Sequence, residues 1–395
     1  MSAPRQGGAL RGLRETNQRL VVDVLRQRGG LSQAEIARAT GLSPASVSNL
    51  VRTLTDQGTA RASRVQRNGG RGVEVTLNPA SGLVAGVDFG NRHMNVAIAD
   101  VAHTIVAEEQ TALAAGHLAS DGVARAAATI HRLVESTGRC PDELIGVAVG
   151  LPGPINRDTG SIASAGILPG WAGINIQEAF EASLPGPVIV DNDANLGAVG
   201  EALWGAGRGC SDFAYLKVST GIGAGLVLNG RLYRGALGTA GEIGHTTIEE
   251  DGPVCRCGNR GCLEVLAGAP ALIELLRNSH GDELTVEDIL KLSADGDVGC
   301  RRVIADAGRH IGVAVANLCN LLSPERIVVG GELALAGEVL LSSLREAMTR
   351  RAISITAETT QVVLGTLRER SAVLGAVGLA LQESERFTIP STSAG

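Results

Sequence analysis

The sequence predicts an α/β body preceded by a small, basic helical module. In the body, strand-like apolar runs alternate with helical patterns, and four of these runs end in glycine-rich turns. The module is set apart by its charge. Residues 1–72 contain twelve Arg, no Lys and four acidic residues, a net charge of +8, whereas the whole chain carries −6 and the remainder therefore −14. This asymmetry favours a polyanionic partner for the module alone, although an ordinary solvated surface is the alternative.

Length and composition limit the class of protein. The 395 residues suffice for two or three domains with sizeable cores, and 44% apolar with 19% charged residues is typical of a soluble globular chain. The sequence has no apolar run of about 20 residues, the length that a membrane-spanning helix needs. The first residues also lack the apolar core of a secretory signal. We therefore expect a cytoplasmic protein with no membrane partner.

Three short helices are predicted in the module. The first covers residues 15–28 and ends at a glycine pair. Ser32 with Glu35 three residues later predicts a capping box at the start of the second, over residues 33–39. The third begins at Ser43-Pro44, with the serine as cap and the proline at the first helical position, and runs to about Gln57.

The second and third helices, joined by a tight glycine turn, are typical of a helix-turn-helix. The third has a polar face whose side chains allow close approach to bases, with one asparagine and one arginine able to form paired hydrogen bonds: Ser43, Ala45, Ser46, Ser48, Asn49 and Arg52. Two predicted strands, 60–67 and 72–77, form a wing whose tip carries Arg71, placed to enter a minor groove. A purely structural hairpin is the alternative for an isolated helix pair. The cap, wing and charge together favour DNA as the partner, and we assign residues 1–80 to this module.

A linker over residues 78–82 precedes the body. The predicted strands are 83–88, 95–100, 144–149, 188–190, 214–218, 225–228 and 326–329. The predicted helices are 119–137, 265–278, 299–322 and 336–351. The glycine-rich turns that follow strands lie at residues 88–91, 150–154, 219–225 and 330–332. Such turns let backbone amides approach a ligand closely, so four of them predict a cleft between two α/β lobes.

A polar cluster, Asp191-Asn192-Asp193-Ala194-Asn195, directly follows the strand at 188–190. Carboxylate and amide groups at a strand end suit hydrogen bonding to several hydroxyls, and a carboxylate there could act as a general base. An Asx turn that caps a helix explains the same residues equally well.

Four residues have the types and spacing of zinc ligands: His245, Cys255, Cys257 and Cys262. Two carboxylates, Glu242 and Glu264, flank them. Seven cysteines with three in eight residues indicate a metal cluster in a reducing compartment rather than a disulfide framework. We expect the others to be small buried apolar residues: Cys140, Cys210, Cys300 and Cys319.

Together these motifs resemble the ROK family of sugar-responsive repressors and sugar kinases, over about residues 10–385. The resemblance rests on Asn192-Asp193-Ala194-Asn195 with Gly200-Glu201, and on Gly241-Glu242-Ile243-Gly244-His245 leading into Cys255-x-Cys257-Gly258-x-x-Gly261-Cys262-x-Glu264. It implies a two-lobed actin/hexokinase-like (ribonuclease H-like) body, dimeric or tetrameric, with a structural zinc. The implied lobes are residues 81–190, joined by a returning helix at about 371–385, and residues 191–370.

The resemblance also implies which residues hold a sugar: Gly153, Asn192, Asp193, Glu242, His245 and Glu264. Asp193 matches the catalytic base of kinase members, and His245 would face zinc with one ring nitrogen and the sugar with the other. Kinase members carry Asp-x-Gly-Gly-Thr at the first phosphate turn, whereas this chain has Asp88-Phe89-Gly90-Asn91-Arg92-His93. Asn91 hinders close backbone approach and Arg92 replaces the hydroxyl.

We therefore expect no efficient kinase activity. The expected protein is a sugar-responsive regulator, acting as a homodimer or homotetramer on a palindromic operator. A sugar kinase with a regulatory DNA-binding head is the first alternative. A zinc-stabilised module with a vestigial sugar site, controlled by a partner protein, is the second.

Overall fold

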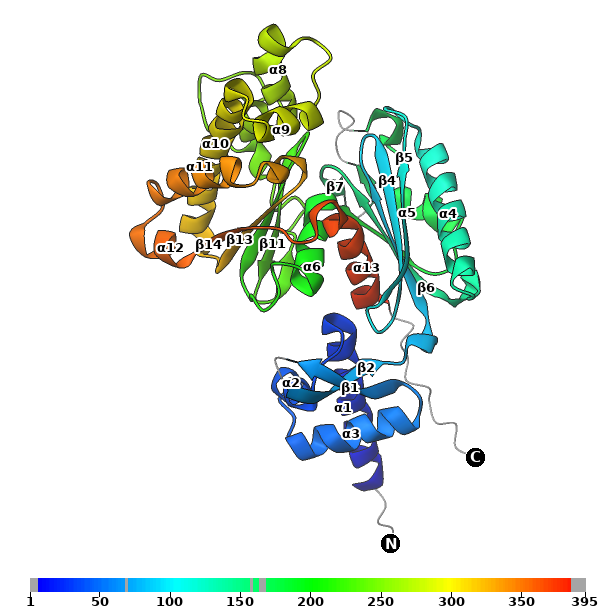
Figure 1. The fold of residues 1–395 in the computed structure, drawn as a ribbon. Helices are drawn as coiled ribbons and strands as arrows, with labels where there is room; N and C mark the ends of the chain where they lie inside the picture. Colours follow the sequence, from blue (N-terminus) through cyan, green and yellow to red (C-terminus); the bar gives the residue numbers. More distant parts are fainter. Residues whose placement is uncertain (1–5, 68–69, 157–158, 163–167, 385–395) are drawn as a thin grey trace.

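The computed structural model describes residues 6–67, 70–156, 159–162 and 168–384. An N-terminal module lies below an α/β body of two lobes, and the last helix returns between them (Figure 1). No helix among these residues is long and apolar enough to cross a membrane.

The module folds as three helices and a two-stranded antiparallel sheet. Its elements are α1 Gln6–Arg28, α2 Gln33–Thr40, α3 Pro44–Asp56, β1 Ala60–Arg67 and β2 Gly70–Leu77. The predicted capping box is present, since the Ser32 backbone N donates to Glu35 Oε2 at 2.8 Å and the Glu35 N donates to Ser32 Oγ at 3.3 Å. The first helix begins well before the expected residue 15.

The first lobe contains a five-stranded sheet in the order β5-β4-β3-β6-β9. Its strands are β3 Leu83–Phe89, β4 His93–Asp100, β5 Ile105–Ala112, β6 Leu144–Leu151 and β9 Val188–Asn192. The helices α4 Ala119–Ser136 and α5 Ile176–Glu181 share one hydrophobic core with this sheet. The other face packs against α13 Ser371–Glu383. A small hairpin, β7 Ile155–Asn156 with β8 Ser161–Ile162, lies beside it.

The second lobe repeats this arrangement. Its sheet has the order β12-β11-β10-β13-β14, again a three-stranded antiparallel meander followed by two parallel strands. The strands are β10 Phe213–Val218, β11 Ile222–Leu228, β12 Arg231–Tyr233, β13 Arg326–Gly330 and β14 Gln361–Leu364. The helices are α7 Leu263–Ala267, α8 Ala269–His280, α9 Val286–Ala294, α10 Val298–Leu322, α11 Glu338–Thr349 and α12 Ser354–Thr359. Two lobes with the same strand order are the ribonuclease H-like arrangement that the resemblance implies.

Helix α6 Asp193–Trp204 packs against both sheets and against α13, so it joins the lobes. The approach of α6 to α13 is very close, because a Cβ on Gly375 would lie 1.6 Å from the Leu196 carbonyl oxygen. A buried carboxylate fixes the same junction. Glu201 of α6 accepts hydrogen bonds from the Ala206 backbone N at 2.6 Å, the Leu367 backbone N at 3.1 Å and Ser371 Oγ at 3.0 Å.

Three expectations need correction. The helix expected over 265–278 is two helices, because Gly268 is extended and a Cβ there would lie 2.6 Å from the Glu264 carbonyl oxygen. Of the turn expected over 219–225, only the first residues form a turn, since Gly223 and Gly225 lie in β11. Cys140 is exposed and Cys210 half-buried, so only Cys300 and Cys319 of the four scattered cysteines are buried.

Candidate functional site

The polar cluster after β9 both caps a helix and faces the neighbouring loop. Asn192 is the N-cap of α6, its Oδ1 accepting from the backbone N of Ala194 at 2.9 Å and of Asn195 at 3.3 Å. Its Nδ2 donates to the Gly153 carbonyl oxygen at 2.9 Å. The two interpretations of this cluster are therefore compatible: one amide caps the helix and also brings the Gly153 loop to the start of α6.

Asp193, the first residue of α6, is paired with a lysine that the sequence interpretation missed. Lys217 Nζ, from β10 of the second lobe, lies 2.5 Å from Asp193 Oδ2, and the side chains are only 24% and 9% exposed. Burial alone would lower the pKa of Lys217, but the carboxylates of Asp193 and Asp88 outweigh it and raise that pKa well above its usual value. Only two lysines occur in the chain. A lysine inside a buried strand was the signal that could have identified it.

Asp88, at the end of β3, belongs to the same charged group. Its Oδ2 accepts from Asn95 Nδ2 at 3.4 Å and lies 3.6 Å from His93 Nε2, while no hydrogen bond reaches Oδ1 from the described residues. Burial acts to raise the pKa of Asp88, but His93, Lys217 and Asn95 together lower it. The His93 ring also lies against Gly90, because a Cβ built on that glycine would meet ring atom Cε1. An imidazole therefore covers the glycine of this turn.

The two glutamates of the second motif lie near Asp193. Glu264 accepts from Arg256 Nη2 at 3.0 Å and from the backbone N of Ile222 at 3.3 Å. Burial raises the pKa of Glu242, and the negative charges of Asp193 and Glu264 raise it further. These carboxylates thus form one cluster that is balanced by two cations, Lys217 and Arg256. Such a cluster presents many hydrogen-bond acceptors to a ligand rich in hydroxyls.

The four predicted metal ligands converge. The ligand atoms of His245, Cys255, Cys257 and Cys262 all lie within 4.8 Å of one another. His245 Nδ1 is 3.6 Å from Cys255 Sγ, and its Nε2 is 3.9 Å from Glu242 Oε2, so the ring has the cysteines on one side and the carboxylate cluster on the other. Burial raises the pKa of the Cys262 thiol to about 12, which means that a thiolate there requires a cation. Three sulfurs and one imidazole nitrogen fit tetrahedral Zn²⁺.

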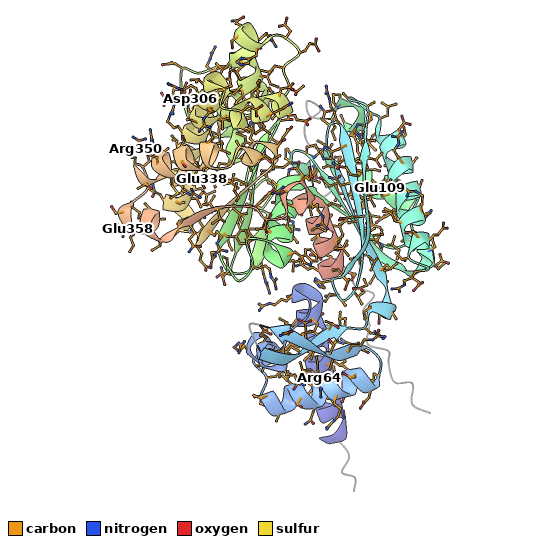
Figure 2. All side chains as sticks on the ribbon, viewed as in Figure 1. Arg64, Glu109, Asp306, Glu338, Arg350 and Glu358 are labelled. Carbon is orange, nitrogen blue, oxygen red and sulfur yellow. The ribbon has the colours of Figure 1, made fainter. Side chains whose placement is uncertain are left out.

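The predicted DNA-contacting residues of α3 are all exposed on one face. Two of them also stabilise the helix start, since Ser43 Oγ accepts from the Ser46 backbone N at 3.2 Å. Arg52 Nη2 donates to Asn49 Oδ1 at 2.7 Å, which holds these two side chains together. Arg71 lies in β2, but its side chain is outside the described part of the chain, as are wing-tip residues 68–69. On β1, Arg64 adds exposed positive charge (Figure 2).

A contact between module and body centres on His103, in the turn between β4 and β5. Its Nε2 lies 2.9 Å from the Arg26 carbonyl oxygen at the end of α1, and burial lowers its pKa. Its ring stacks at 5.7 Å, between centroids, on Trp204, the last residue of α6. One side chain therefore contacts both the module and the helix that begins at Asp193.

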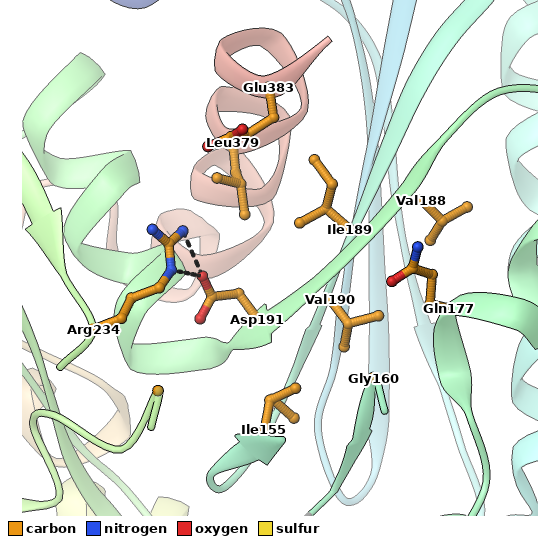
Figure 3. A pocket seen from close by; sticks show the side chains of 11 residues that line it. Ile155, Gly160, Gln177, Val188, Ile189, Val190, Asp191, Arg234, Leu379 and Glu383 are labelled. Atoms are coloured by element: carbon orange, nitrogen blue, oxygen red, sulfur yellow. Dashed lines mark hydrogen bonds and ion pairs between the residues drawn. The ribbon is translucent and has the colours of Figure 1, made fainter. Parts of the chain in front are cut away.

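A pocket of about 210 Å³ lies beside the polar cluster rather than at it (Figure 3). Asp191 and Arg234 stand at its edge, with Arg234 Nε and Nη2 each 2.7 Å from Asp191 Oδ2. This bidentate pair joins β9 of the first lobe to the segment after β12 of the second. The carboxylate cluster is therefore bordered by two ion pairs between the sheets, Asp191 with Arg234 and Asp88 with Lys217.

Comparison with known proteins adds a family. A model described as the ROK family matches residues 84–383, and one described as the IclR helix-turn-helix domain matches residues 21–63. The xylose repressor of Caldicellulosiruptor bescii is 29% identical over 390 residues, covering 95% of this chain and 98% of its own. The DNA-binding transcriptional dual regulator NagC of Escherichia coli is 30% identical over 380 residues, covering 91% of each chain.

Solved structures share the fold. A ROK family transcriptional regulator, a homologue of the E. coli MLC protein, matches with a TM-score of 0.75 and 24% identity over 94% of this chain and 97% of its own. A ROK family glucokinase from Streptomyces griseus, in complex with glucose and AMPPNP, gives a TM-score of 0.67 and 27% identity over 76% of this chain and 100% of its own.

Proposed function

The chain belongs to the ROK family, and we propose that it is a sugar-responsive repressor of genes for carbohydrate uptake or catabolism. The observation that carries the proposal is the presence, in one chain, of an exposed polar α3 face and a carboxylate cluster suited to hydroxyls. Relatives named xylose repressor and N-acetylglucosamine repressor, which align over more than nine-tenths of the chain, support it.

The DNA-binding part is residues 1–80 in this proposal. The contacts come from Ser43, Ala45, Ser46, Ser48, Asn49, Arg52 and, on the wing, Arg71. A homodimer would set two α3 helices on a palindromic operator, with half-sites about one helical turn or a multiple of it apart. The basic charge of the module and its IclR-type match support this assignment.

The effector in this proposal is a sugar or sugar derivative held between residues 81–190, with α13, and residues 191–370. Gly153, Asn192 and Asp193 would hold it from the start of α6, and Glu242, His245 and Glu264 from the second lobe. What supports this is the meeting of the carboxylates in one partly buried cluster. Since Asp191, Asp193 and their basic partners come from different sheets, a ligand here would contact both lobes.

Zinc in this proposal is structural. His245, Cys255, Cys257 and Cys262 would fill all four positions, which leaves no open position for a reacting group. The metal would fix the orientation of the His245 ring and the loop that carries Glu242 and Glu264. The 3.9 Å separation of His245 Nε2 from Glu242 supports this link between metal and sugar pocket.

Two features argue against efficient kinase activity, the first alternative. Asn91 and Arg92 alter the first phosphate turn, and the His93 ring lies against Gly90 where a phosphate would need open backbone. Asp193, which matches the kinase base, has its carboxylate paired with Lys217 at 2.5 Å. A carboxylate held by a lysine is stabilised as the anion and is a weaker base toward a hydroxyl.

The path from sugar to DNA in this proposal follows α6. The helix has 12 residues and spans about 18 Å at 1.5 Å per residue, from Asp193 to Trp204. At its far end Trp204 contacts His103, which is bonded to the end of α1. A ligand that closes the lobes would move α6 and so change the docking of the module. The expected coupling is about 1–3 kcal/mol.

A DNA mobility-shift titration on the protein's own promoter, with a panel of neutral sugars and sugar phosphates, tests the function. We expect at least one sugar to change the DNA affinity by about 5- to 150-fold. Asp193→Ala and the milder Asp193→Asn should bind DNA but lose this response. Promoter binding that no sugar changes would contradict the function, and a normal response in both variants would contradict the pocket. Robust phosphorylation in a coupled kinase assay would favour the kinase alternative.

A further inference from the structure

A second group of possible metal ligands lies at the junction of α8 and α10, outside the motif that points to zinc. His280 is the last residue of α8, Asp297 is the N-cap of α10, and Cys300 lies in the first turn of α10. His280 Nε2 is 3.5 Å from Asp297 Oδ2 and 3.9 Å from Cys300 Sγ. The three ligand atoms all lie within 4.8 Å of one another. These separations match the spacing of neighbouring ligands around a tetrahedral metal with bonds of about 2.0–2.3 Å.

The hydrogen bonds around His280 orient its ring for this role. Ser279 Oγ lies 2.8 Å from His280 Nδ1 and 3.0 Å from the Leu276 carbonyl oxygen. Because the carbonyl can only accept, the hydroxyl gives its proton to Leu276 and accepts from Nδ1–H. A neutral ring with its proton on Nδ1 has a free lone pair on Nε2, the atom that faces Asp297 and Cys300. A second hydrogen bond of this kind is what metal-binding histidines usually make.

The other two groups also leave lone pairs at the same point. Asp297 caps α10 through Oδ1, which accepts from the Cys300 backbone N at 2.7 Å, so Oδ2 is the oxygen that faces His280. Cys300 is buried, and burial raises the pKa of its thiol to about 11. A carboxylate oxygen and an unprotonated imidazole nitrogen 3.5 Å apart repel each other unless a cation lies between them. A proton on His280 would serve, and so would a divalent metal.

We propose that His280, Asp297 and Cys300 bind a second divalent transition-metal ion of the Zn²⁺ class. One nitrogen, one carboxylate oxygen and one sulfur suit Zn²⁺, with a water in the fourth position. On binding, the Cys300 thiol releases its proton to solvent and the sulfur bonds to the metal as a thiolate. The ion would fasten the end of α8 to the start of α10 and would take no part in the sugar cluster.

The test is the zinc content of the full-length protein, measured by plasma mass spectrometry after equilibration with zinc and removal of loosely bound metal. We expect two zinc ions per chain in the unaltered protein, one in His280→Gln and Cys300→Ser, and one in Cys257→Ser. His280→Gln is the milder change, since His280 is partly exposed whereas Cys300 is buried. Cys319→Ser, a buried cysteine in neither group, should retain two. With Co²⁺ in place of zinc, Cys257→Ser should still show a thiolate-to-cobalt absorption band, and the additional His280→Gln change should remove it.

The outcomes separate this site from the one assigned to the proposed function. A zinc content that His280→Gln and Cys300→Ser leave unchanged would overturn the proposal and leave the imidazolium–carboxylate pair as the explanation. One zinc that persists in Cys257→Ser and is lost in His280→Gln would support the proposal while contradicting the first site. One zinc that is lost only in Cys257→Ser would do the reverse.

Discussion

Lys217 supplies the positive charge between two acidic side chains of the sugar cluster. Its Nζ lies 2.5 Å from Asp193 Oδ2, and Asp88 also raises its pKa. The three residues come from β10, α6 and β3, so the pair is formed only when both lobes are folded and packed. Its removal would leave two largely buried carboxylates close together without a nearby lysine.

Lys217→Met keeps the chain length of the side chain but removes this charge. We expect the free energy of unfolding of the body to fall by about 2–4 kcal/mol at pH 7.5, somewhat below a fully buried pair because Lys217 is 24% exposed. Urea unfolding measures this loss. Lys291→Met, at the only other lysine and exposed on α9, is the matched control and should change stability little.

The pH dependence of this loss has a definite sign. The lowered pKa of Asp88 gives stability that is present above pH 3.8, its unfolded value, and is lost as pH falls through the folded value. The raised pKa of Lys217 gives stability that is present below pH 10.5 and is lost as pH rises through the folded value. The difference between Lys217→Met and the unaltered protein should therefore be full at pH 7.5 and smaller near pH 3.5. An equal difference at both pH values would contradict the ion pair as its cause.

The sequence identified the acidic residues of the site but missed their cation for a physical reason. Asp193 and Glu242 stand in motifs whose local spacing indicates a site, whereas the partners of Lys217 come from other strands and helices. Such pairing depends on tertiary structure and leaves no local pattern. Asp191, whose carboxylate holds Arg234 from the other lobe, was noted only as part of the cluster for the same reason.

At the scale of elements, caps and apolar periodicity predicted what local chemistry determines. Ser32 and Ser43 began α2 and α3 where expected, and Gly268 divided a helix that periodicity alone had joined. Strand β5 was missed because its alternating burial includes Glu108, Glu109 and Gln110, a polar run without a strand-like composition. Half-buried edge strands of this kind depend on their neighbour, β4, for their pairing.

The contact between α6 and α13 requires a glycine. Gly375→Ala would place a Cβ 1.6 Å from the Leu196 carbonyl oxygen, so the helices would have to move apart. We expect a loss of more than about 2 kcal/mol of unfolding free energy, because overpacking against backbone cannot relax by a rotamer change. Thermal unfolding measures it. Gly12→Ala, at a helical glycine with nothing within 4 Å of the new Cβ, should be neutral or slightly stabilising. Equal stability of the two variants would contradict the close packing.

The loop from Gly241 to Glu264 shows how a metal could govern a pocket in which it has no direct part. Cys257→Ser should lower the zinc content, since it removes one of four ligands, and should weaken the effector response because Glu242 and Glu264 lose a fixed loop. Zinc analysis and the DNA mobility shift measure both effects. Cys140→Ser, at an exposed cysteine outside the cluster, is the control. An intact sugar response in a zinc-free Cys257→Ser protein would show that metal and pocket are independent.

At the scale of the whole molecule, the module meets the body through contacts at the end of α1. Arg26 Nη1 donates to the Ser384 carbonyl oxygen at 2.6 Å, Gln382 Nε2 donates to the Gln27 carbonyl oxygen at 3.4 Å, and His103 bonds the Arg26 carbonyl oxygen. The first two come from the end of α13, and the third is the one that also contacts α6. If α6 carries the sugar signal, His103 is the side chain through which the module would receive it.

His103→Ala tests this coupling. We expect unchanged sugar affinity by calorimetry, because the residue lies at the opposite end of α6 from Asp193, and retained operator binding, because the α3 face is untouched. The sugar-induced change in DNA affinity should fall to within about threefold of none, since a coupling of 1–3 kcal/mol would lose one of its contacts. His131→Ala, on α4 and away from both contacts, serves as control. A full sugar response in His103→Ala would mean that α13 alone transmits the change, because its contacts with Arg26 and Gln27 would remain.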